Sequence, residues 1–291
     1  MSDDGSRGLT IIGFIGSVFS PWYHWSGRGR PEEHCCFNVA GFGPGSRFTM
    51  TDRGADALST SRDTLRIGPS AMRWTGTRLE IELDERGAPP VPRRVRGRVT
   101  VTPTAVTDRE LLLSPDGAHV WRPYAPAARM EVEMNGVRWS GHGYLDGNFG
   151  TRPLEDDFSY WTWGRFPIRR GATCFYEAVR RDGTEANAAL AFDAEGGVTR
   201  TEAPPRAPLP PTLWRVRRAT RADAGYAPRQ VCNMLDSPFY SRASVRTRID
   251  GEETVGMHEA LDLDRFRSPL IKPMVAMRVP RRGRWRPRAQ S

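Results

Sequence analysis

Short runs of alternating apolar and polar residues recur along the whole chain, and glycine, proline or aspartate bounds most of them. Alternation with a period of two is typical of strands that bury one face. We predict strands at residues 10–18, 35–39, 47–51, 78–83, 94–102, 128–133, 172–179, 188–192, 213–218, 244–249 and 254–263. Residues 52–58 alone favour a helix, of one or two turns.

The segments between these runs indicate how the predicted strands are joined. Asp182-Gly183 and Asp250-Gly251 are typical of hairpin turns, and 29 glycines and 24 prolines are spread along the chain. Many short strands without long helices predict an all-β fold, an antiparallel sandwich or barrel. With 291 residues the chain can form one large β domain or two smaller ones. We expect two, at residues 1–166 and 167–291, with the proline-rich residues 203–211 as an alternative linker.

The charge of the chain narrows the choice of partners only slightly. The formal net charge is +9, but Lys272 is the only lysine and the arginines are dispersed without a recognition motif, so we expect no nucleic-acid partner. The C-terminal tail concentrates basic residues around Trp285, and either contact with anionic membrane lipid or a disordered basic terminus explains it. Its arginines are Arg278, Arg281, Arg282, Arg284, Arg286 and Arg288.

Cysteine usage and the N-terminal sequence bear on localisation. The four cysteines form no CxxC pair, which fits a reducing cytosol. The first eight residues lack the cationic opening of a secretory signal. The apolar residues 9–19 are too few to span a bilayer, so we expect a buried strand there and a cytoplasmic protein.

The densest group of polar and aromatic residues lies at 139–150 and begins with Trp139. In an extended segment His142, Tyr144, Asp146 and Asn148 share one face. This pattern fits either a solvated edge strand with glycine bulges or a functional surface.

A second group lies at 116–123, where strand alternation aligns His119 with Trp121. A hydrogen-bonded strand histidine is the structural alternative. Two aromatic clusters, with Trp22 and Tyr23 at 21–25 and Trp161 and Trp163 at 158–163, fit core packing or the lining of an apolar pocket for a flat conjugated ligand.

Several other chemistries find no support in the sequence. The five histidines lack metal-ligand spacing, so we expect no metal site. No GxSxG, Walker or dinucleotide-binding motif occurs. Asp156 and Asp157 are adjacent, and on a strand they would face opposite ways, so we expect no shared carboxylate site.

Six blocks together carry a family resemblance: GFIGSVFSPWY at 13–23, HCCFNV at 34–39, DGAHVW at 116–121, GYLDGN at 143–148, MHEALDLDRF at 257–266 and MRVPR at 277–281. With them the chain resembles the carotenoid 1,2-hydratases, or hydroxyneurosporene synthases, of purple phototrophic bacteria. The resemblance implies two lipocalin-like antiparallel β-barrels packed together. It also implies cofactor-free addition of water to the terminal C1=C2 bond of neurosporene or lycopene, with active-site residues at His119, Trp121, Tyr144 and Asp146.

These residue types suit such a reaction. Protonation of the less substituted alkene carbon leaves a tertiary cation, so Asp146 must be kept neutral by burial to act as the acid. The rings of Trp121 and Tyr144 can stabilise the cation. His119 orients the water, accepts its proton or returns a proton to Asp146, and these three roles stay open.

The substrate is expected to lie against further aromatic and polar side chains. These are Trp22, Tyr23, Trp139, His142, Asn148, Trp161 and Trp163. A lipid-soluble substrate predicts peripheral association with the inner or intracytoplasmic membrane. The alternatives are a non-catalytic lipocalin-type carrier of an apolar ligand and another acid-catalysed terpenoid or polyketide enzyme on the same fold.

Overall fold

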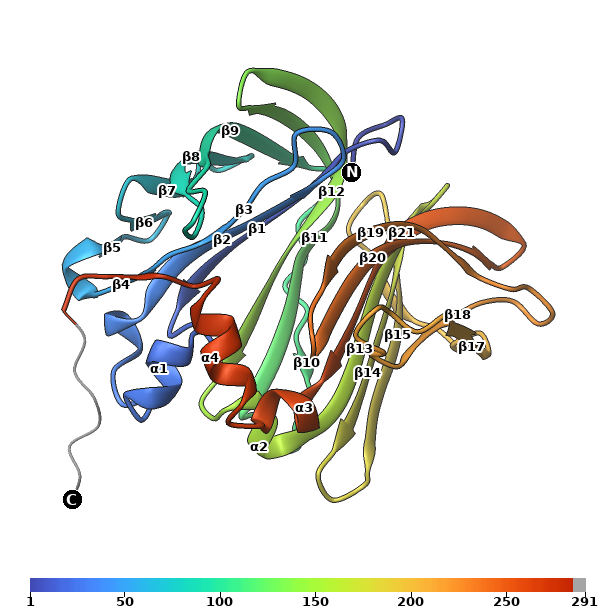
Figure 1. Ribbon diagram of the computed structural model, residues 1–291. Helices are drawn as coiled ribbons and strands as arrows, with labels where there is room; N and C mark the ends of the chain where they lie inside the picture. The colour runs from blue at the N-terminus through green and yellow to red at the C-terminus, as the bar shows by residue number, and fades with distance from the viewer. Residues whose placement is uncertain (285–291) are drawn as a thin grey trace. The chain divides into compact units, whose positions relative to one another are not determined.

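The computed structural model describes residues 1–284 and is built mainly from antiparallel strands (Figure 1). The helices of this part are short: α1 (Pro21–Trp25), α2 (Leu154–Asp157), α3 (Leu263–Arg267) and α4 (Ile271–Ala276). The predicted all-β class is therefore confirmed. Among residues 1–284, no helix has the length and apolar character that crossing a bilayer requires.

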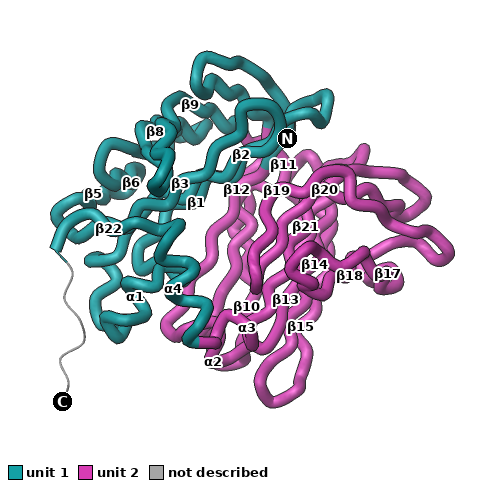
Figure 2. Tube along the Cα trace, in the orientation of Figure 1, with its two compact units in different colours: residues 1–102, 129–143, 269–291 teal, residues 103–128, 144–268 magenta. Residues whose placement is uncertain are grey.

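The chain forms two compact units (Figure 2). Unit 1 comprises Met1–Thr102, Arg129–Gly143 and the chain from Pro269 onward, and unit 2 comprises Pro103–Ala128 and Tyr144–Ser268. The strands β11 (His119–Met134) and β12 (Val137–Gly150) contribute residues to both. The domain boundary expected at residue 166 falls within strand β13 (Phe158–Ile168). The division into domains at residues 1–166 and 167–291 stays a prediction.

Unit 1 contains a small sheet and a meander. The small sheet has the order β1-β2-β4-β22, with β3 paired to β2, and the meander runs from β9 through β8, β7 and β6 to β5. The small sheet consists of β1 (Gly8–Ile15), β2 (Cys35–Phe42), β3 (Phe48–Met50), β4 (Asp52–Arg53) and β22 (Arg281–Arg282). The meander consists of β5 (Leu58–Thr60), β6 (Thr64–Ile67), β7 (Ser70–Trp74), β8 (Leu79–Arg86) and β9 (Arg94–Pro103).

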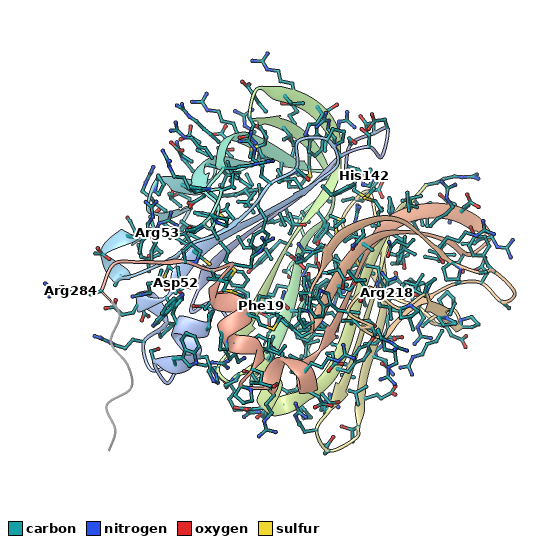
Figure 3. All side chains as sticks on the ribbon, viewed as in Figure 1. Phe19, Asp52, Arg53, His142, Arg218 and Arg284 are labelled. Atoms are coloured by element: carbon teal, nitrogen blue, oxygen red, sulfur yellow. The ribbon has the colours of Figure 1, made fainter. Side chains whose placement is uncertain are left out.

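Charged side chains are buried inside unit 1. Arg53 and Asp52 are labelled in Figure 3. Arg53 Nη2 lies 2.6 Å from Glu85 Oε2, and the neighbouring Asp52 pairs with Arg281. Ser70 Oγ donates to Glu85 at 2.7 Å. Each buried charge has an opposite charge or a hydroxyl group beside it, which offsets the free-energy cost of removing the charge from water. These contacts also hold the ends of the strands next to one another.

Unit 2 is organised by a seven-stranded antiparallel sheet with the order β16-β15-β14-β13-β21-β20-β19. Its strands besides β13 are β14 (Gly171–Arg180), β15 (Glu185–Asp193), β16 (Val198–Arg200), β19 (Arg229–Asp236), β20 (Tyr240–Ile249) and β21 (Glu252–Asp262). A two-stranded sheet joins β17 (Arg206–Leu209) to β18 (Arg218–Arg221), and β10 (Leu111–Leu112) pairs with β11. Within residues 1–284 each sheet keeps two open ends in its pairing order.

Most of the predicted strands lie where the alternation placed them, and two predictions are wrong. Residues 213–218 form a loop up to Arg218, because Pro210 and Pro211 supply no backbone donors and Arg215 adopts φ 58°. Residues 52–58 form β4 and a single 3-10 turn at Ala55–Ala57 rather than an α-helix. Strands β5 to β7 were missed, because they are only three to five residues long.

Candidate active site

A hydrogen bond joins two of the residues singled out from the sequence. Trp121 Nε1 on β11 donates to Asp146 Oδ2 on β12 at 2.8 Å. Trp121 is 1% exposed and Asp146 is half-buried. Burial raises the pKa of Asp146 to about 6, the Trp121 hydrogen bond opposes this rise, and the charges of Glu259 and Arg242 raise and lower it respectively. Asp146 thus holds a proton at a pH where a solvated aspartate has lost it.

Aromatic rings surround this carboxyl group. The ring centroid of Tyr144, two residues before Asp146 on β12, lies 5.0 Å from that of Trp163. The centroid of Tyr176 lies 5.6 Å from that of Trp121 and 5.8 Å from that of Trp161. Burial raises the pKa of the Tyr144 and Tyr176 hydroxyls well above its usual value, and the charge of Asp146 adds to this. Both tyrosines therefore present neutral rings to the site.

Four cross-strand neighbours form a row on the seven-stranded sheet. Tyr176 pairs with Trp163, Trp163 pairs with Glu259, and Glu259 pairs with Arg242. Directly opposed residues of antiparallel strands share one face, so these side chains lie side by side. Arg242 Nε donates to Glu259 Oε1 at 2.7 Å, and their side chains are 4% and 16% exposed. The row places a shielded ion pair beside the aromatic rings.

His119 is held by a different group of residues. Its Nε2 lies 2.6 Å from Asp157 Oδ2, its ring packs 5.0 Å from that of Phe158, and the residue is 2% exposed. Arg152 Nε donates to the same Asp157 oxygen at 3.0 Å. The sequence-based expectation placed Asp157 on a strand. In the structure Asp157 lies in helix α2, and its carboxylate holds the His119 ring in place. Within residues 1–284, no hydrogen bond links His119 to Asp146.

The side chains expected to line the substrate divide between the units. Trp161 and Trp163, on β13, belong to the aromatic group of unit 2, and Asn148 is exposed on β12. Unit 1 contains the remaining four. They are Trp22, Tyr23, Trp139 and His142.

The unit 1 residues have structural contacts of their own. Trp22 Nε1 donates to the carbonyl of Val279 at 2.7 Å, and Tyr23 Oη donates to that of Arg28 at 3.1 Å, so both residues tie helix α1 into its surroundings. The backbone of His142 pairs with that of Met1, whose ammonium group donates to the His142 carbonyl at 2.8 Å. Trp139 is half-buried on β12.

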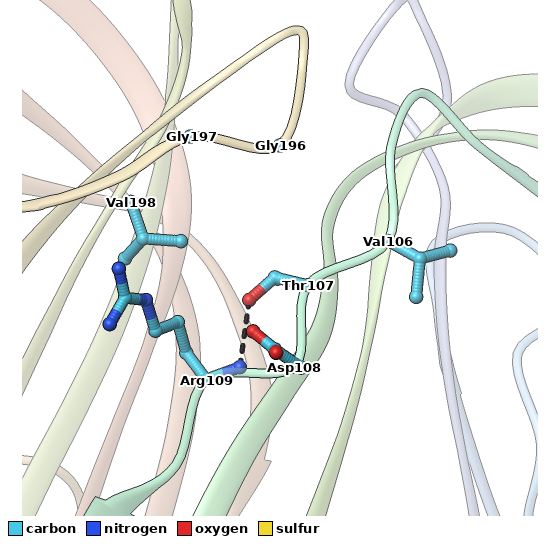
Figure 4. A pocket seen from close by; sticks show the side chains of 7 residues that line it. All are labelled: Val106, Thr107, Asp108, Arg109, Gly196, Gly197 and Val198. Carbon is cyan, nitrogen blue, oxygen red and sulfur yellow. Dashed lines mark hydrogen bonds between the residues drawn. The ribbon is translucent and has the colours of Figure 1, made fainter.

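Two pockets in unit 2 lack the predicted catalytic residues. One, of about 370 Å³, is lined by residues 106–109 and 196–198, where Thr107 Oγ1 accepts a hydrogen bond from the Arg109 amide (Figure 4). The other, of about 420 Å³, is lined mainly by residues 210–213 and 228–236. Arg218 at its edge already donates to Gln230 and to the Pro210 carbonyl. Neither pocket is lined by a buried carboxyl group.

Sequence reasoning missed Glu259, Arg242 and Tyr176. A signal for Glu259 was present, because it occupies an alternating strand position whose neighbours on the same face, Met257 and Leu261, are apolar. An inward charge on such a face needs a partner or a function. Within residues 1–284 no three His, Cys, Asp or Glu side chains gather as a metal site.

Comparisons with known proteins identify the family of the chain. The carotenoid hydratase CrtC family matches residues 11–288. The acyclic carotenoid 1,2-hydratase of Cereibacter sphaeroides is 58% identical over 276 residues, 94% of this chain and 99% of its own. That of Rhodobacter capsulatus is 55% identical over 278 residues, covering 95% and 99%. The chain therefore belongs to the carotenoid hydratase CrtC family, a family of hydro-lyases.

A solved structure shares the fold. The crystal structure of CghA with Sch210972 matches with a TM-score of 0.55 and 13% identity, covering 90% of this chain and 86% of that one. At this identity the likeness concerns the fold alone.

The raised pKa of Asp146 makes a prediction about stability. The folded-state pKa of about 6 exceeds the ordinary value of 3.8, so the unfolded chain loses this proton first and the native state is disfavoured as pH rises from 4 through 6. We expect Asp146→Asn to raise the free energy of unfolding at pH 8 by about 1–3 kcal/mol and to change it little at pH 4. Urea unfolding at both pH values measures this. An equal loss of stability at both would contradict it.

Proposed function

We propose that the protein hydrates the terminal C1=C2 bond of acyclic carotenoids such as neurosporene and lycopene, giving 1-hydroxy carotenoids. The observation that carries this proposal is the carboxyl group of Asp146, which has a pKa of about 6, accepts a hydrogen bond from Trp121 and is surrounded by aromatic rings. The high identity to two acyclic carotenoid 1,2-hydratases supports the substrate class.

In this mechanism Asp146 gives its proton to C2 and leaves a tertiary cation at C1. The rings of Trp121 and Tyr144 stabilise the cation, by about 0.5–2 kcal/mol each when water is excluded. Water then adds at C1. Trp161 and Trp163 continue the aromatic surface along β13 and are proposed to contact the polyene. The contact with Asp157 favours a role for His119 in fixing strand β11, and thus Trp121, two residues away.

The proposal also covers the barrel fold of the two units and a contact with the membrane surface. We propose that each unit is a lipocalin-like barrel, supported by the antiparallel meanders that form both units. We also propose peripheral contact with anionic lipid through the basic C-terminal segment, of which Arg278 to Arg284 are described and Trp285, Arg286 and Arg288 lie outside the described residues. Flotation with anionic and neutral vesicles tests this contact.

The direct test of the function is incubation of the purified protein with neurosporene or lycopene. We expect a product heavier by one water. Binding without conversion would identify a carrier, and a cyclised product of unchanged mass would identify a different acid-catalysed enzyme.

The proton donor also predicts a pH dependence. Because Asp146 must carry its proton to start the reaction, turnover is expected to be constant at low pH and to fall about tenfold per pH unit above pH 6. In Trp121→Phe the hydrogen bond that favours the anion is lost, so the fall should begin at higher pH. Initial rates across pH 4.5 to 9 measure both curves. A rate that rises across this range would contradict the assignment.

A further inference from the structure

We propose that Glu259 is the base that takes the proton of the attacking water, and that Arg242 and Trp163 hold this water beside it. The inference rests on the proposed hydration and assigns its second half, the capture of the cation. It gives the site two carboxyl groups with opposite tasks. Asp146 delivers a proton, and Glu259 receives one.

The first observation behind this inference is the position of Glu259 in the sheet. Its pairing partners are Trp163 on β13 and Arg242 on β20, so it lies between these two side chains on one face of the sheet. Trp163 stacks on Tyr144, two residues from Asp146, and the charge of Glu259 acts on Asp146, Tyr144 and Tyr176. Glu259 therefore faces the same space as the proposed acid.

The second observation is a pair of buried donors on either side of Glu259. Among residues 1–284, Arg242 Nη1 and Trp163 Nε1 are two of the buried side-chain nitrogens without a hydrogen-bond partner. Their residues are 4% and 5% exposed. Buried donors nearly always have a partner, and a bound water is the usual one where protein groups supply none. Both donors flank the 16% exposed Glu259 side chain, which can accept a proton from the same water.

The two carboxyl groups have contrasting environments, as an acid and a base require. Asp146 has an indole N–H as its hydrogen-bond partner, and burial raises its pKa. Glu259 instead shares an ion pair with a buried guanidinium group, which stabilises negative charge. Sites whose carboxyl groups differ in this way commonly assign the acid to one and the base to the other.

The step balances without a cofactor. Asp146 transfers a proton to C2, which leaves a carboxylate and a cation at C1. A lone pair of water forms the C1–O bond while Glu259 takes one of the water protons, and another water lone pair stays hydrogen-bonded to Arg242 or Trp163. The proton then passes from Glu259 back to Asp146 through solvent, which restores both groups. Arg242 is a positioning residue, since it acts on Glu259 and on water.

Deuterium exchange separates the two halves of the reaction. In D₂O, a cation that is formed but not captured returns to the alkene, and deuterium stays at C2 of the recovered substrate when rotation about the adjoining single bonds lets Asp146 take the original C2 hydrogen instead of the delivered deuteron. For Glu259→Gln we expect hydration to fall about 10²- to 10⁴-fold while deuterium still enters the substrate. Asp146→Asn should lose both hydration and exchange. Mass spectrometry of recovered substrate and product gives both quantities.

Glu253→Gln is the matched control. Glu253 lies on the same strand and also pairs with an arginine of β20, Arg246, at 2.7 Å, but both side chains are about half exposed. Its variant should hydrate at the wild-type rate. Because Glu259→Gln leaves Arg242 buried without its counter-charge, a second variant, Glu259→Gln with Arg242→Gln, removes both charges and keeps the row of side chains filled. It should also retain exchange without hydration.

The outcomes are distinct. Exchange without hydration in either folded variant supports Glu259 as the base. Hydration within about threefold of wild type, or loss of exchange together with hydration in the folded double variant, would overturn it. Wild-type protein without hydration, or Asp146→Asn with full exchange, would instead refute the proposed function itself.

Discussion

Replacing Asp146 with asparagine is expected to lower carotenoid hydration by about 10²- to 10⁴-fold, because asparagine keeps the shape of the side chain and has no acidic proton. The amide oxygen can still accept the hydrogen bond from Trp121 Nε1, so the aromatic surroundings are retained. Product formation from lycopene measures the loss. Quenching of tryptophan fluorescence by the polyene should show that binding remains within a few-fold of wild type.

A surface carboxylate of the same unit provides the control for that variant. Asp250 is exposed in the turn before β21 and adopts φ 51°, a conformation that asparagine tolerates. Asp250→Asn should therefore hydrate lycopene normally. Undiminished hydration by Asp146→Asn would remove Asp146 from the mechanism.

Trp121→Ala is expected to lower both the stability of the protein and its turnover. Trp121 is buried at 1% exposure against Tyr176, so its removal should cost about 3–5 kcal/mol of unfolding free energy. Loss of one ring from the cation site should slow turnover about 2- to 30-fold in the protein that remains folded. Urea unfolding and initial rates at a temperature where the variant is folded measure the two effects.

Trp121→Phe divides these contributions. Phenylalanine retains a ring and most of the buried apolar surface and lacks the N–H group, so most of the stability and of the cation stabilisation should return. A phenylalanine variant as slow as the alanine variant would show that the hydrogen bond to Asp146, and not the ring, carries the effect.

The sequence was sufficient to predict the parts of the site that depend on local alternation. Tyr144 and Asp146 are two residues apart on one strand, as are His119 and Trp121, so a period of two aligns each pair. The contact between Trp121 and Asp146 depends on the pairing of β11 with β12, which alternation alone did not predict. The family resemblance implied only that both residues belong to the active site.

The residues that were missed depend on cross-strand register. Glu259 and Arg242 come from strands more than about ninety residues beyond Asp146, and nothing local fixes that Glu259 pairs with Trp163 on one side and Arg242 on the other. Asp157 was set aside because a strand was assumed where the chain makes one turn of helix. Trp22 and Tyr23 are the opposite case, because the sequence singled them out as substrate contacts. In the structure their polar groups donate hydrogen bonds to backbone carbonyls of unit 1.

The central claim is that Asp146 retains its proton up to about pH 6, well above the range of a solvated aspartate, and infrared titration of the carboxyl C=O band tests it most directly. The difference between wild type and Asp146→Asn isolates the band of this one side chain. We predict that the band disappears with a midpoint near pH 6. A midpoint near 4, the value of a solvated aspartate, would contradict the account.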